Sequence, residues 1–481
     1  MKVEVKQVEL GASGADLVAV GLFEGAELPA PIAAAPGADE AKPGFKQLSL
    51  LRPHDFPPVL VVGLGERDEL DAEGLRVAAA VAAKEAARLE ARSIAWTLLE
   101  TDDLGAAAEA LVTGTILASY RFDRFKSGEK GDTPRLESLT LIGPEGVGAA
   151  AEIARVAAEA QNRARDLQGT PANVATPTLL AERAEEIASG SETLTAEVLG
   201  RAELEEKKMG GLLAVSQGGP QEPKLIVLRY SGDGSGPILG LVGKGVTFDT
   251  GGISLKPGAG MPDMKMDMSG AAAVLESVAA IAELELPLDL IAVVPSTENM
   301  PSGTAVKPGD IITQYNGKTV EVNNTDAEGR LILADALAYA VELGAERLVD
   351  IATLTGAVTI ALGSTYAAVI ANDDALAEAV HEAGERSGEL TWRLPLHPEY
   401  KELMKGKFAD LSNLASKRKA GTITAASFLE EFVGETPWAH IDIAGIAYDV
   451  GRPYVGNGPS GFGVRLLVDL ARRSASEDHS A

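Results

Sequence analysis

Short apolar runs alternate with longer amphipathic stretches along most of this chain. In the first third, the runs at residues 59–62 and 93–98 are strand-like, and the Ala-rich stretch at residues 74–92 has the period of a helix. An alternation of strands and helices is typical of an α/β domain. We therefore predict such a domain at the start of the chain.

The second half of the chain repeats this alternation with further strands and helices. Strand-like apolar runs occupy residues 225–228, 238–242, 290–294, 347–351 and 440–443. Helical stretches separate several of them, at residues 269–284, 331–343 and 375–385. Such predominantly apolar runs suit a sheet covered on both faces, and the spacing is that of βαβ crossovers. These features predict a mostly parallel, twisted sheet flanked by helices.

A long helical stretch lies between these two parts. Residues 148–167 form one continuous helical pattern, which stops at Gly169-Thr-Pro171. We expect this helix to join two α/β domains, residues 1–158 and residues 159–481, each built on a mostly parallel sheet. The length of 481 residues agrees with this expectation, because it exceeds that of one typical domain.

Composition and charge limit the partners that such a protein can have. Apolar residues make up 46% of the chain, and the formal net charge of -27 repels nucleic-acid backbones and anionic lipid surfaces. The first six residues carry charges where a signal peptide needs an apolar run, and no stretch of about 18 uncharged apolar residues occurs. We expect a soluble, cytoplasmic protein with no membrane partner and no general nucleic-acid partner. The lack of cysteine excludes disulfides, thiolate zinc sites and cysteine nucleophiles.

The densest chemical signal precedes the predicted helix at residues 331–343. Asp326, Glu328 and Arg330 stand two positions apart within the sequence Asn-Thr-Asp-Ala-Glu-Gly-Arg-Leu. Because the chain has no cysteine and its five histidines lie in no motif, carboxylate oxygens are nearly the only ligands it offers to a divalent cation. The two carboxylates therefore predict a metal site.

Three further segments with unusual chemistry follow predicted strands. A glycine-rich segment carries Lys244, Asp249 and Lys256, Asp267 stands just ahead of a helix, and the sequence Thr-Leu-Thr-Gly begins at Thr353. Open α/β sheets bind ligands beyond the carboxyl ends of their strands, and glycines let the backbone approach a ligand closely. We expect all these segments to meet in one crevice.

Each of these residues has a simpler explanation when it is taken alone. Asp267 is more often a helix N-cap than a ligand, Asp326 and Glu328 could form a solvated turn or a helix cap, and both lysines could lie on the surface. The segment around Lys244 is not a Walker-type phosphate loop, because Gly245 stands where that loop needs Ser or Thr. Only the combination of these residues favours a functional site.

In combination, the motifs resemble the leucyl aminopeptidase family. The resemblance rests on residues 243–252 with Lys256 and, in this order, on residues 264–270, 298–303, 323–331, 353–356 and 442–445. It covers almost all of the predicted second domain and little of the first. One departure, at residues 169–173, affects the connection between the domains more than the chemistry.

The resemblance implies a metal-dependent aminopeptidase that removes N-terminal, preferably Leu-like residues from peptides. It also implies a homohexamer, for which the first domain would serve assembly. The implied ligands of two divalent ions, Mn or Zn, are Lys244, Asp249, Asp267, Asp326 and Glu328. The implied catalytic residues are Lys256 and Arg330, with bicarbonate at Arg330. The segments that shape the side-chain pocket contain Met264, Thr353, Leu354, Gly356 and Ala444.

Elementary chemistry agrees with these implied roles. Four carboxylates carry enough charge for two divalent ions about 3.5 to 4 Å apart, with Asp249 and Glu328 as bridges. Such ions lower the pKa of bound water from about 15.7 toward roughly 7 and so provide a nucleophile for a peptide carbonyl. Lys244 can bind metal only as the neutral amine, which requires a lowered pKa, whereas Lys256 as an ammonium would stabilise an oxyanion.

Two other classes of function remain open at this stage. A dinuclear phosphoesterase uses similar carboxylates, although such sites usually include His and Asn. A catalytically silent scaffold of the same fold would have lost ligands, whereas every matched position in this chain carries the expected residue. The carboxylates favour Mn or Mg, and the nitrogen ligand also permits Zn.

Overall fold

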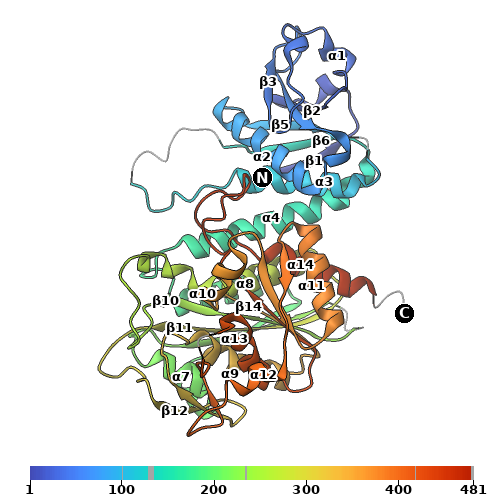
Figure 1. Cartoon of the computed structure of the whole chain (residues 1–481). Helices are drawn as coiled ribbons and strands as arrows, with labels where there is room; N and C mark the ends of the chain where they lie inside the picture. Colours follow the sequence, from blue (N-terminus) through green and yellow to red (C-terminus); the bar gives the residue numbers. More distant parts are fainter. Residues whose placement is uncertain (100, 128–134, 233–235, 418, 478–481) are drawn as a thin grey trace. The chain divides into compact units, whose positions relative to one another are not determined.

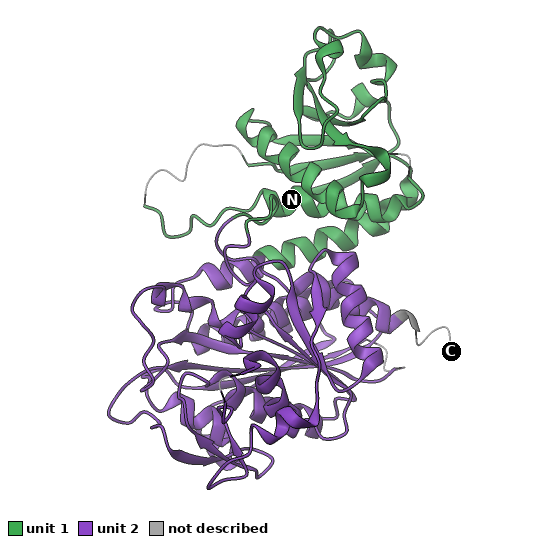
Figure 2. Cartoon of the chain, in the orientation of Figure 1, with its two compact units in different colours: residues 1–162, 451–456 green, residues 163–450, 457–481 purple. Residues whose placement is uncertain are grey.

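The chain folds into two compact units (Figures 1 and 2). The computed structural model describes residues 1–99, 101–127, 135–232, 236–417 and 419–477. Unit 1 comprises residues 1–162 and 451–456, and unit 2 comprises residues 163–450 and 457–481. Helix α4 (Gly148–Gly169) runs from unit 1 into unit 2. The predicted fold class, two α/β domains with mostly parallel sheets joined by a long helix, is confirmed.

Unit 1 is built on a sheet with the strand order β1-β6-β5-β2-β4-β3. Neighbouring strands are parallel except at the edge, where β3 runs antiparallel to β4. Every residue of β4 is buried, as an apolar run in a sheet covered on both faces requires. The strands are β1 (Lys2–Lys6), β2 (Leu17–Phe23), β3 (Leu48–Leu51), β4 (Val59–Gly65), β5 (Ser93–Thr97) and β6 (Ser138–Ile142).

Helices cover both faces of this sheet. On one face, α2 (Ala72–Arg88) and α3 (Leu104–Ala118) pack around the fully buried Trp96. On the other face, the short helix α1 (Ala30–Ala33) contributes the buried Ile32 to a smaller cluster. Short 3-10 turns complete unit 1, at η1 (Leu10–Ala12), η2 (Ala38–Glu40), η3 (Arg67–Glu69) and η4 (Glu145–Val147).

Unit 2 contains, within the described residues, a nine-stranded sheet and a three-stranded sheet. The centre of the large sheet follows the order β18-β14-β9-β11, and these neighbours are all parallel. Towards the edges, β8 runs antiparallel to β11 and β15 antiparallel to β18. The large sheet consists of β7 (Leu194–Leu199), β8 (Lys224–Ser231), β9 (Leu239–Gly243), β10 (Gly245–Asp249), β11 (Asp289–Asn299), β14 (Arg347–Ala352), β15 (Ala367–Ala371), β16 (Thr391–Arg393) and β18 (Trp438–Asp442). The small sheet consists of β12 (Asp310–Thr313), β13 (Thr319–Val322) and β17 (Leu411–Ser412).

Helices also cover both faces of the large sheet, as the predicted crossovers require. One face carries α5 (Pro177–Ser189), α8 (Ser269–Glu283), α11 (Asp374–Ser387) and α14 (Val464–Glu477). The other face carries α7 (Gly210–Ser216), α9 (Gly329–Glu342) and α13 (Gly421–Leu429), with the largest apolar core beneath them. Shorter elements lie beside them, namely α6 (Arg201–Glu206), α10 (Gly356–Leu362), α12 (Pro398–Glu402), η5 (Met261–Met268) and η6 (Glu430–Phe432). None of the helices in the described residues combines the length and apolar character that crossing a membrane requires.

The parallel strands of unit 2 bring the segments with candidate chemistry to one edge of the sheet. The strand β9 ends directly before Lys244, β10 ends at Asp249, β14 ends directly before Thr353, and β18 ends at Asp442. Because β9, β10, β11, β14 and β18 share one direction, their carboxyl ends meet.

Candidate metal centre

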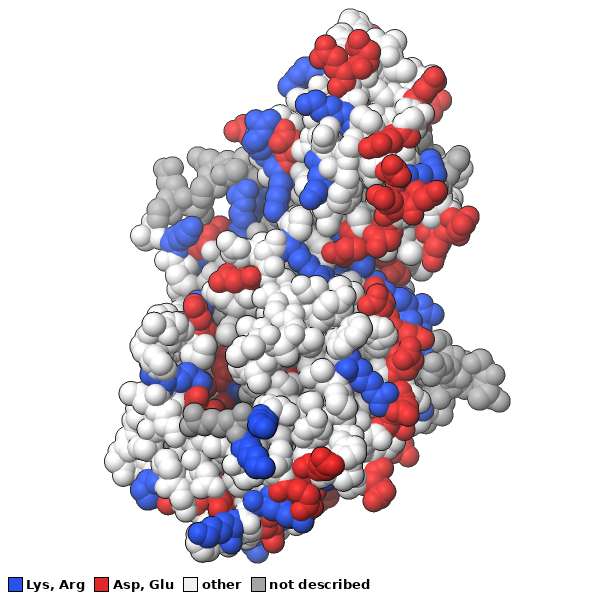
Figure 3. Space-filling view, in the orientation of Figure 1, with Lys and Arg blue, Asp and Glu red and all other residues white. Residues whose placement is uncertain are grey.

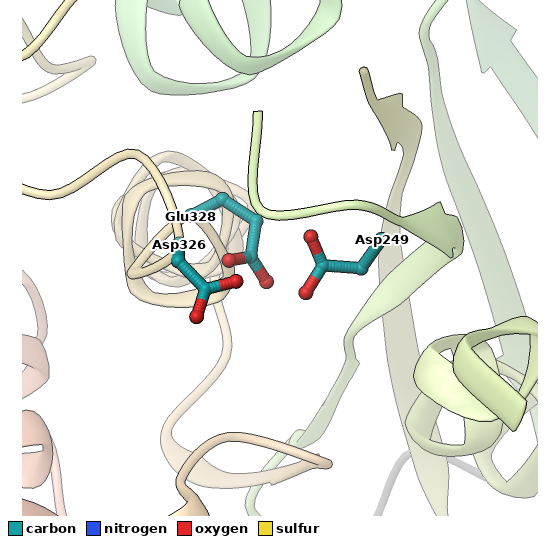
Figure 4. Close-up of side chains that lie close together, drawn as sticks. All are labelled: Asp249, Asp326 and Glu328. Carbon is teal, nitrogen blue, oxygen red and sulfur yellow. The ribbon is translucent and has the colours of Figure 1, made fainter. Parts of the chain in front are cut away.

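Three carboxylates converge at this edge of the sheet. Asp249 ends β10, while Asp326 and Glu328 directly precede α9, and one oxygen from each lies within 4.8 Å of the other two. The three groups point toward one another (Figure 4). Asp249 and Glu328 are buried and Asp326 is half-buried. Three negative charges at this spacing repel one another unless cations lie among them.

Lys244 supplies one of these cations. Its Nζ lies 2.7 Å from Glu328 Oε1 and 2.8 Å from Asp267 Oδ1, and it donates a hydrogen bond of 3.0 Å to the Thr353 carbonyl. Gly329 leaves room for it, because a Cβ at that position would lie 2.8 Å from Lys244 Nζ. Burial lowers the pKa of Lys244, but the neighbouring carboxylates outweigh burial and leave the pKa raised. With 2% exposure, Lys244 is not a surface lysine.

Lys256 supplies the second cation. Its Nζ lies 2.9 Å from Asp249 Oδ2 and also pairs with Asp326 Oδ1. The loop turns back through Gly251 at φ +85°, and the Lys256 N–H then donates to the Thr250 carbonyl at 2.8 Å. Burial lowers the pKa of Lys256, but the neighbouring carboxylates, Asp249 above all, raise it by more. The pKa of Lys256 therefore lies above its usual value. This lysine therefore carries a positive charge directly beside the acidic cluster.

Asp267 completes the acidic cluster and does not cap a helix. It lies in η5, and the N-cap residue of α8 is Met268. Its Oδ1 accepts hydrogen bonds of 2.8 Å from Lys244 and from Thr353 Oγ1. Its Oδ2 is buried and accepts none from the residues that the structure describes. Burial raises the pKa of Asp267 well above its usual value. A buried carboxylate oxygen without a partner costs free energy unless a cation meets it.

The donors of this cluster fit divalent cations. Hard carboxylate oxygens come from four side chains, and the Lys244 amine adds a nitrogen ligand once it has lost its proton. Burial also raises the pKa values of Asp326 and Glu328, so protons compete for these oxygens. A divalent ion among these groups would lower the pKa values of the carboxyls and of Lys244, because it favours charged carboxylate oxygens and a neutral amine.

Arg330 lies one residue into α9, at 8% exposure. Its Nη1 donates a hydrogen bond of 2.9 Å to the Asn413 carbonyl, while its buried Nε has no partner among the described residues. Burial lowers the pKa of Arg330 to about 10, against the opposing effect of Glu328 and then Asp442. A buried guanidinium with a free donor suits the binding of a small planar anion.

The predicted pocket residues lie on three neighbouring segments. Thr353 contacts the acidic cluster directly, and Leu354 and Ala444 are half-buried and pack against the core beneath α9. Gly356 begins α10, and the half-buried Met264 lies in η5. On the face drawn in Figure 3, unit 2 is hollowed and acidic surface lies inside the hollow.

Two residues at this edge belong to the segments that carry the resemblance, but the sequence assigned them no role. Asn299 Nδ2 donates to Asp249 Oδ1 at 2.9 Å and to the Thr325 carbonyl at 3.0 Å, so it orients one of the carboxylates. The second is Asp442, whose carboxylate accepts hydrogen bonds from the Leu354 segment. Each is the last residue of a strand at the ligand-binding edge, a position that could have identified both.

His440 follows Trp438 on the same face of β18 and belongs to the core. His440 Nδ1 lies 2.7 Å from Asp350 Oδ1, and both side chains are completely buried. The second oxygen of Asp350 accepts a hydrogen bond of 2.7 Å from Trp438 Nε1. Neither His440 nor Asp350 takes part in the acidic cluster.

Family models match most of the chain. The model described as "Cytosol aminopeptidase family, catalytic domain" matches residues 162–468, and its N-terminal counterpart matches residues 40–129. A "probable cytosol aminopeptidase" of Roseiflexus castenholzii is 45% identical over 490 residues, which cover 98% of this chain and 99% of the relative. A protein of the same description from a Geobacter species is 48% identical over 424 residues, 86% of this chain and 85% of that protein.

Solved structures show the same architecture. The bottromycin maturation enzyme BotP superposes with a TM-score of 0.87 at 37% identity, over 96% of this chain and all of that one. A mutant of tomato leucine aminopeptidase superposes with a TM-score of 0.87 at 35% identity, over 98% of this chain and 96% of that one. One structure of BotP is a complex with Mn.

Proposed function

The chain belongs to the cytosol aminopeptidase family, which makes it a metal-dependent aminopeptidase, and we propose that it preferentially removes Leu-like N-terminal residues from peptides by means of metal-activated water. The observation that carries this proposal is the convergence of Asp249, Asp326 and Glu328 within 4.8 Å. Lys244 and Asp267 adjoin the same cluster, so all five proposed ligands lie together.

Lys244, Asp249, Asp267, Asp326 and Glu328 hold two divalent ions, Mn or Zn, in this proposal. The Mn complex of the related BotP supports Mn as one candidate. When bound, such ions act as Lewis acids and lower the pKa of water from about 15.7 toward roughly 7. No side-chain nucleophile is then required.

Lys256 stabilises the oxyanion that forms when the peptide carbonyl becomes tetrahedral. Its ammonium is fixed between Asp249 and Asp326, which keep it charged and limit its motion. A fixed positive charge in a partly buried site stabilises developing negative charge without reorganising when the reaction occurs. We assign Lys256 to the catalytic residues for this reason.

Arg330 would hold a small anion, which would supply an acceptor for the proton of the attacking water. Its free Nε and its burial suit a planar oxyanion such as bicarbonate. With a pKa of about 10, the guanidinium stays charged at neutral pH. Bicarbonate, if bound there, would meet a charged guanidinium.

The segments of Met264, Thr353, Leu354, Gly356 and Ala444 form the pocket for the N-terminal side chain. Thr353 links this pocket to the acidic cluster, so a substrate whose α-amine meets the cluster places its first side chain beside Leu354 and Ala444. Their apolar character favours Leu-like residues. Discrimination among apolar side chains is modest, at about 1 to 3 kcal/mol for each methylene.

Three further features belong to this proposal. The protein acts in the cytoplasm, as the names of its relatives suggest. Residues 159–481 carry the catalysis and residues 1–158 serve assembly, and the enzyme is a homohexamer. Light scattering of the purified protein tests the last statement, because a monomeric mass would contradict it.

The test of the activity uses purified protein loaded with Mn or Zn. We expect it to release the aniline from a leucine anilide, to leave the same compound intact when its α-amine is acetylated, and to lose activity when the metal is removed. Hydrolysis of a phosphate monoester instead of the anilide would replace the proposal with a phosphoesterase. Bound metal without hydrolysis of either compound would favour a catalytically silent scaffold.

A further inference from the structure

The carboxylate of Asp442 lies at the end of β18, directly beside the proposed pocket. The side chain is completely buried and sits on the α9 face of the sheet, on the same side as Trp438. Asp442 is neither a proposed metal ligand nor a member of the acidic cluster. Its role therefore has to come from the groups that it contacts.

Backbone groups from both sides of the pocket converge on one oxygen of Asp442. Its Oδ1 accepts hydrogen bonds from the N–H groups of Leu354 at 3.1 Å, Thr355 at 3.3 Å and Ala444 at 3.2 Å. Leu354 and Ala444 lie 90 residues apart in the chain, yet a single atom fixes both. These are two of the residues to which we assign the pocket wall.

The other oxygen of Asp442 fixes the start of the following helix. Asp442 Oδ2 accepts a hydrogen bond of 2.6 Å from Thr355 Oγ1. Thr355 Oγ1 also accepts a hydrogen bond from the Val358 N–H at 3.3 Å, which caps α10, and lies 2.9 Å from Thr422 Oγ1 of α13. The loop after β14 thus has its position fixed by Asp442 at one end and by the Thr353 contacts with the acidic cluster at the other.

We infer that Asp442 is the positioning residue of the specificity pocket: it sets the separation of the Leu354 and Ala444 walls, and thereby the preference for the first side chain of the substrate. This inference rests on the proposed function, because it presumes that these walls bind that side chain. Asp442 acts through the backbone of the loop and touches neither the reacting bond nor the metal ligands.

The chemistry of Asp442 suits this task better than a neutral side chain would. A carboxylate can accept several hydrogen bonds at once and binds N–H donors more strongly than a neutral acceptor does. Without it, the buried Thr355 N–H and the half-buried N–H groups of Leu354 and Ala444 lose their partner, and the loop must move to satisfy them. Such a movement changes the shape of the pocket, whereas the contacts of Asp249 with Lys256 and Asn299 do not involve this loop.

The decisive measurement is the ratio of kcat/KM for a leucine anilide to kcat/KM for an alanine anilide. A methylene in an apolar pocket is worth about 10- to 200-fold in kcat/KM, so we expect Asp442→Ala to shift this ratio by at least about tenfold. Asp442→Asn keeps one oxygen for the three N–H groups, so its ratio should stay near that of the unchanged protein. The metal content should stay the same in all three proteins.

Asp335 offers a matched control in the same unit. It is also a completely buried carboxylate that accepts backbone hydrogen bonds, from Leu212 at 2.9 Å and from Tyr315 at 2.8 Å. Its donors lie outside the pocket segments. Asp335→Ala should therefore lower stability without changing the ratio of the two kcat/KM values. This control distinguishes the general effect of losing a buried carboxylate from a change in the shape of the pocket.

A second pair of variants decides the matter if Asp442→Ala does not fold. Thr355→Val removes the hydroxyl that binds Asp442 Oδ2, whereas Thr355→Ser retains it. We expect a shifted ratio in the first and an unchanged ratio in the second. Equal ratios in a folded Asp442→Ala protein and the unchanged protein, or in the two Thr355 variants, would overturn the inference. Failure of the unchanged, metal-loaded protein to cleave either anilide would instead overturn the proposed function.

Discussion

At the scale of single residues, the site consists of buried or partly buried lysines and carboxylates in direct ion pairs. Lys244 and Lys256 each contact two carboxylates, and Asp249, one of the two beside Lys256, is only 3% exposed. Charges that are buried in this way interact strongly because little solvent screens them. Their placement is therefore better explained by chemistry than by stability, since an apolar replacement for such a network is often as stable.

Replacing Lys256 by Ala should lower turnover and leave the metal bound. Removal of one group that stabilises an oxyanion costs roughly 10²- to 10³-fold in kcat, so we expect a loss of that order. Turnover is measured at a metal occupancy equal to that of the unchanged protein. Lys307→Ala is the control, because Lys307 forms only an exposed ion pair with Asp310. A Lys256→Ala protein with full turnover would show that this ammonium does not act on the transition state.

Replacing Gly329 by Ala should weaken metal binding. The added Cβ would lie 2.8 Å from Lys244 Nζ, so the amine must move away from Asp267 and Glu328. Displacing the support of a ligand typically costs about 10- to 100-fold in metal affinity. Elemental analysis after equilibration with limiting Mn measures the loss. Gly148→Ala is the control, since a Cβ at the start of α4 would meet nothing within 4 Å; equal metal contents in both variants would contradict the prediction.

At the scale of elements, the sequence predicts the strands β8, β9, β11, β14 and β18 of the large sheet and misses both of its edge strands, β7 and β16, together with β10 and β15. In unit 1 it predicts β4 and β5 but misses β2, which lies between them. The runs that became β9 and β14 are almost completely buried, so most of their residues are apolar and they are easily recognised. The edge strand β7 alternates between buried and exposed positions, and its sequence contains Thr195 and Glu197. Its hydrophobic signal is therefore weak, and its pairing depends on β8, which lies 25 residues or more away in the chain.

In the site, too, residues that are close together in the chain could be predicted, whereas contacts between distant segments could not. Asp326, Glu328 and Arg330 lie within five residues and could be identified together. The partners of Arg330 and Leu354 could not, because Asn413 and Asp442 lie more than 80 residues from them in the chain. A pattern of spacing reports neighbours along a helix or strand, whereas these contacts arise from the order of strands in the sheet.

The buried carboxylate of Asp335 ties α9 to α7 and to the turn after β12. Burial raises its pKa to about 7, against the opposing effect of the backbone hydrogen bonds that it accepts. The folded state therefore binds a proton at Asp335 more tightly than the unfolded chain, where the pKa is about 3.9. Its contribution to the free energy of unfolding is complete below pH about 4 and is lost as pH rises to about 7, by at most about 1.4 kcal/mol for each pH unit.

Urea titrations between pH 4 and pH 8 test this contribution. We expect the free energy of unfolding of the unchanged protein to fall relative to that of Asp335→Asn as pH rises toward 7. Above pH 7 the difference between the two free energies should stay constant. The amide keeps an acceptor but does not titrate, so the comparison removes the effect of all other ionising groups. Parallel pH profiles for the two proteins would show that Asp335 titrates normally.

At the scale of the whole molecule, charge is distributed unevenly between surface and site. The chain carries a formal net charge of -27, and acidic side chains are spread over the face drawn in Figure 3. An overall negative charge attracts divalent cations and repels anionic polymers. Lys244 and Lys256 form ion pairs with the acidic cluster, and Arg330 lies where Glu328 affects its pKa, so these three cationic groups balance part of the charge of the cluster.

Metal binding should change the local stability of unit 2 in a restricted pattern. Every proposed ligand lies in unit 2, in the segments around residues 244–249, 267 and 326–328. A ligand that binds only the folded site stabilises it by about 2.7 kcal/mol at a concentration 100 times its Kd. Backbone amides of these segments and of the Thr353 loop, whose carbonyl contacts Lys244, should therefore exchange more slowly in the presence of Mn.

Hydrogen exchange followed by mass spectrometry measures this pattern over both units in one experiment. Peptides from residues 1–99 contain no proposed ligand, so their exchange should be the same with and without Mn. The Asp267→Asn variant provides the matched control: it removes one charged ligand, and the protection of the ligand segments should fall with it. Uniform protection of both units would contradict a localised centre, because it would show that the metal stabilises the chain as a whole and not the cluster at the carboxyl edge of the sheet.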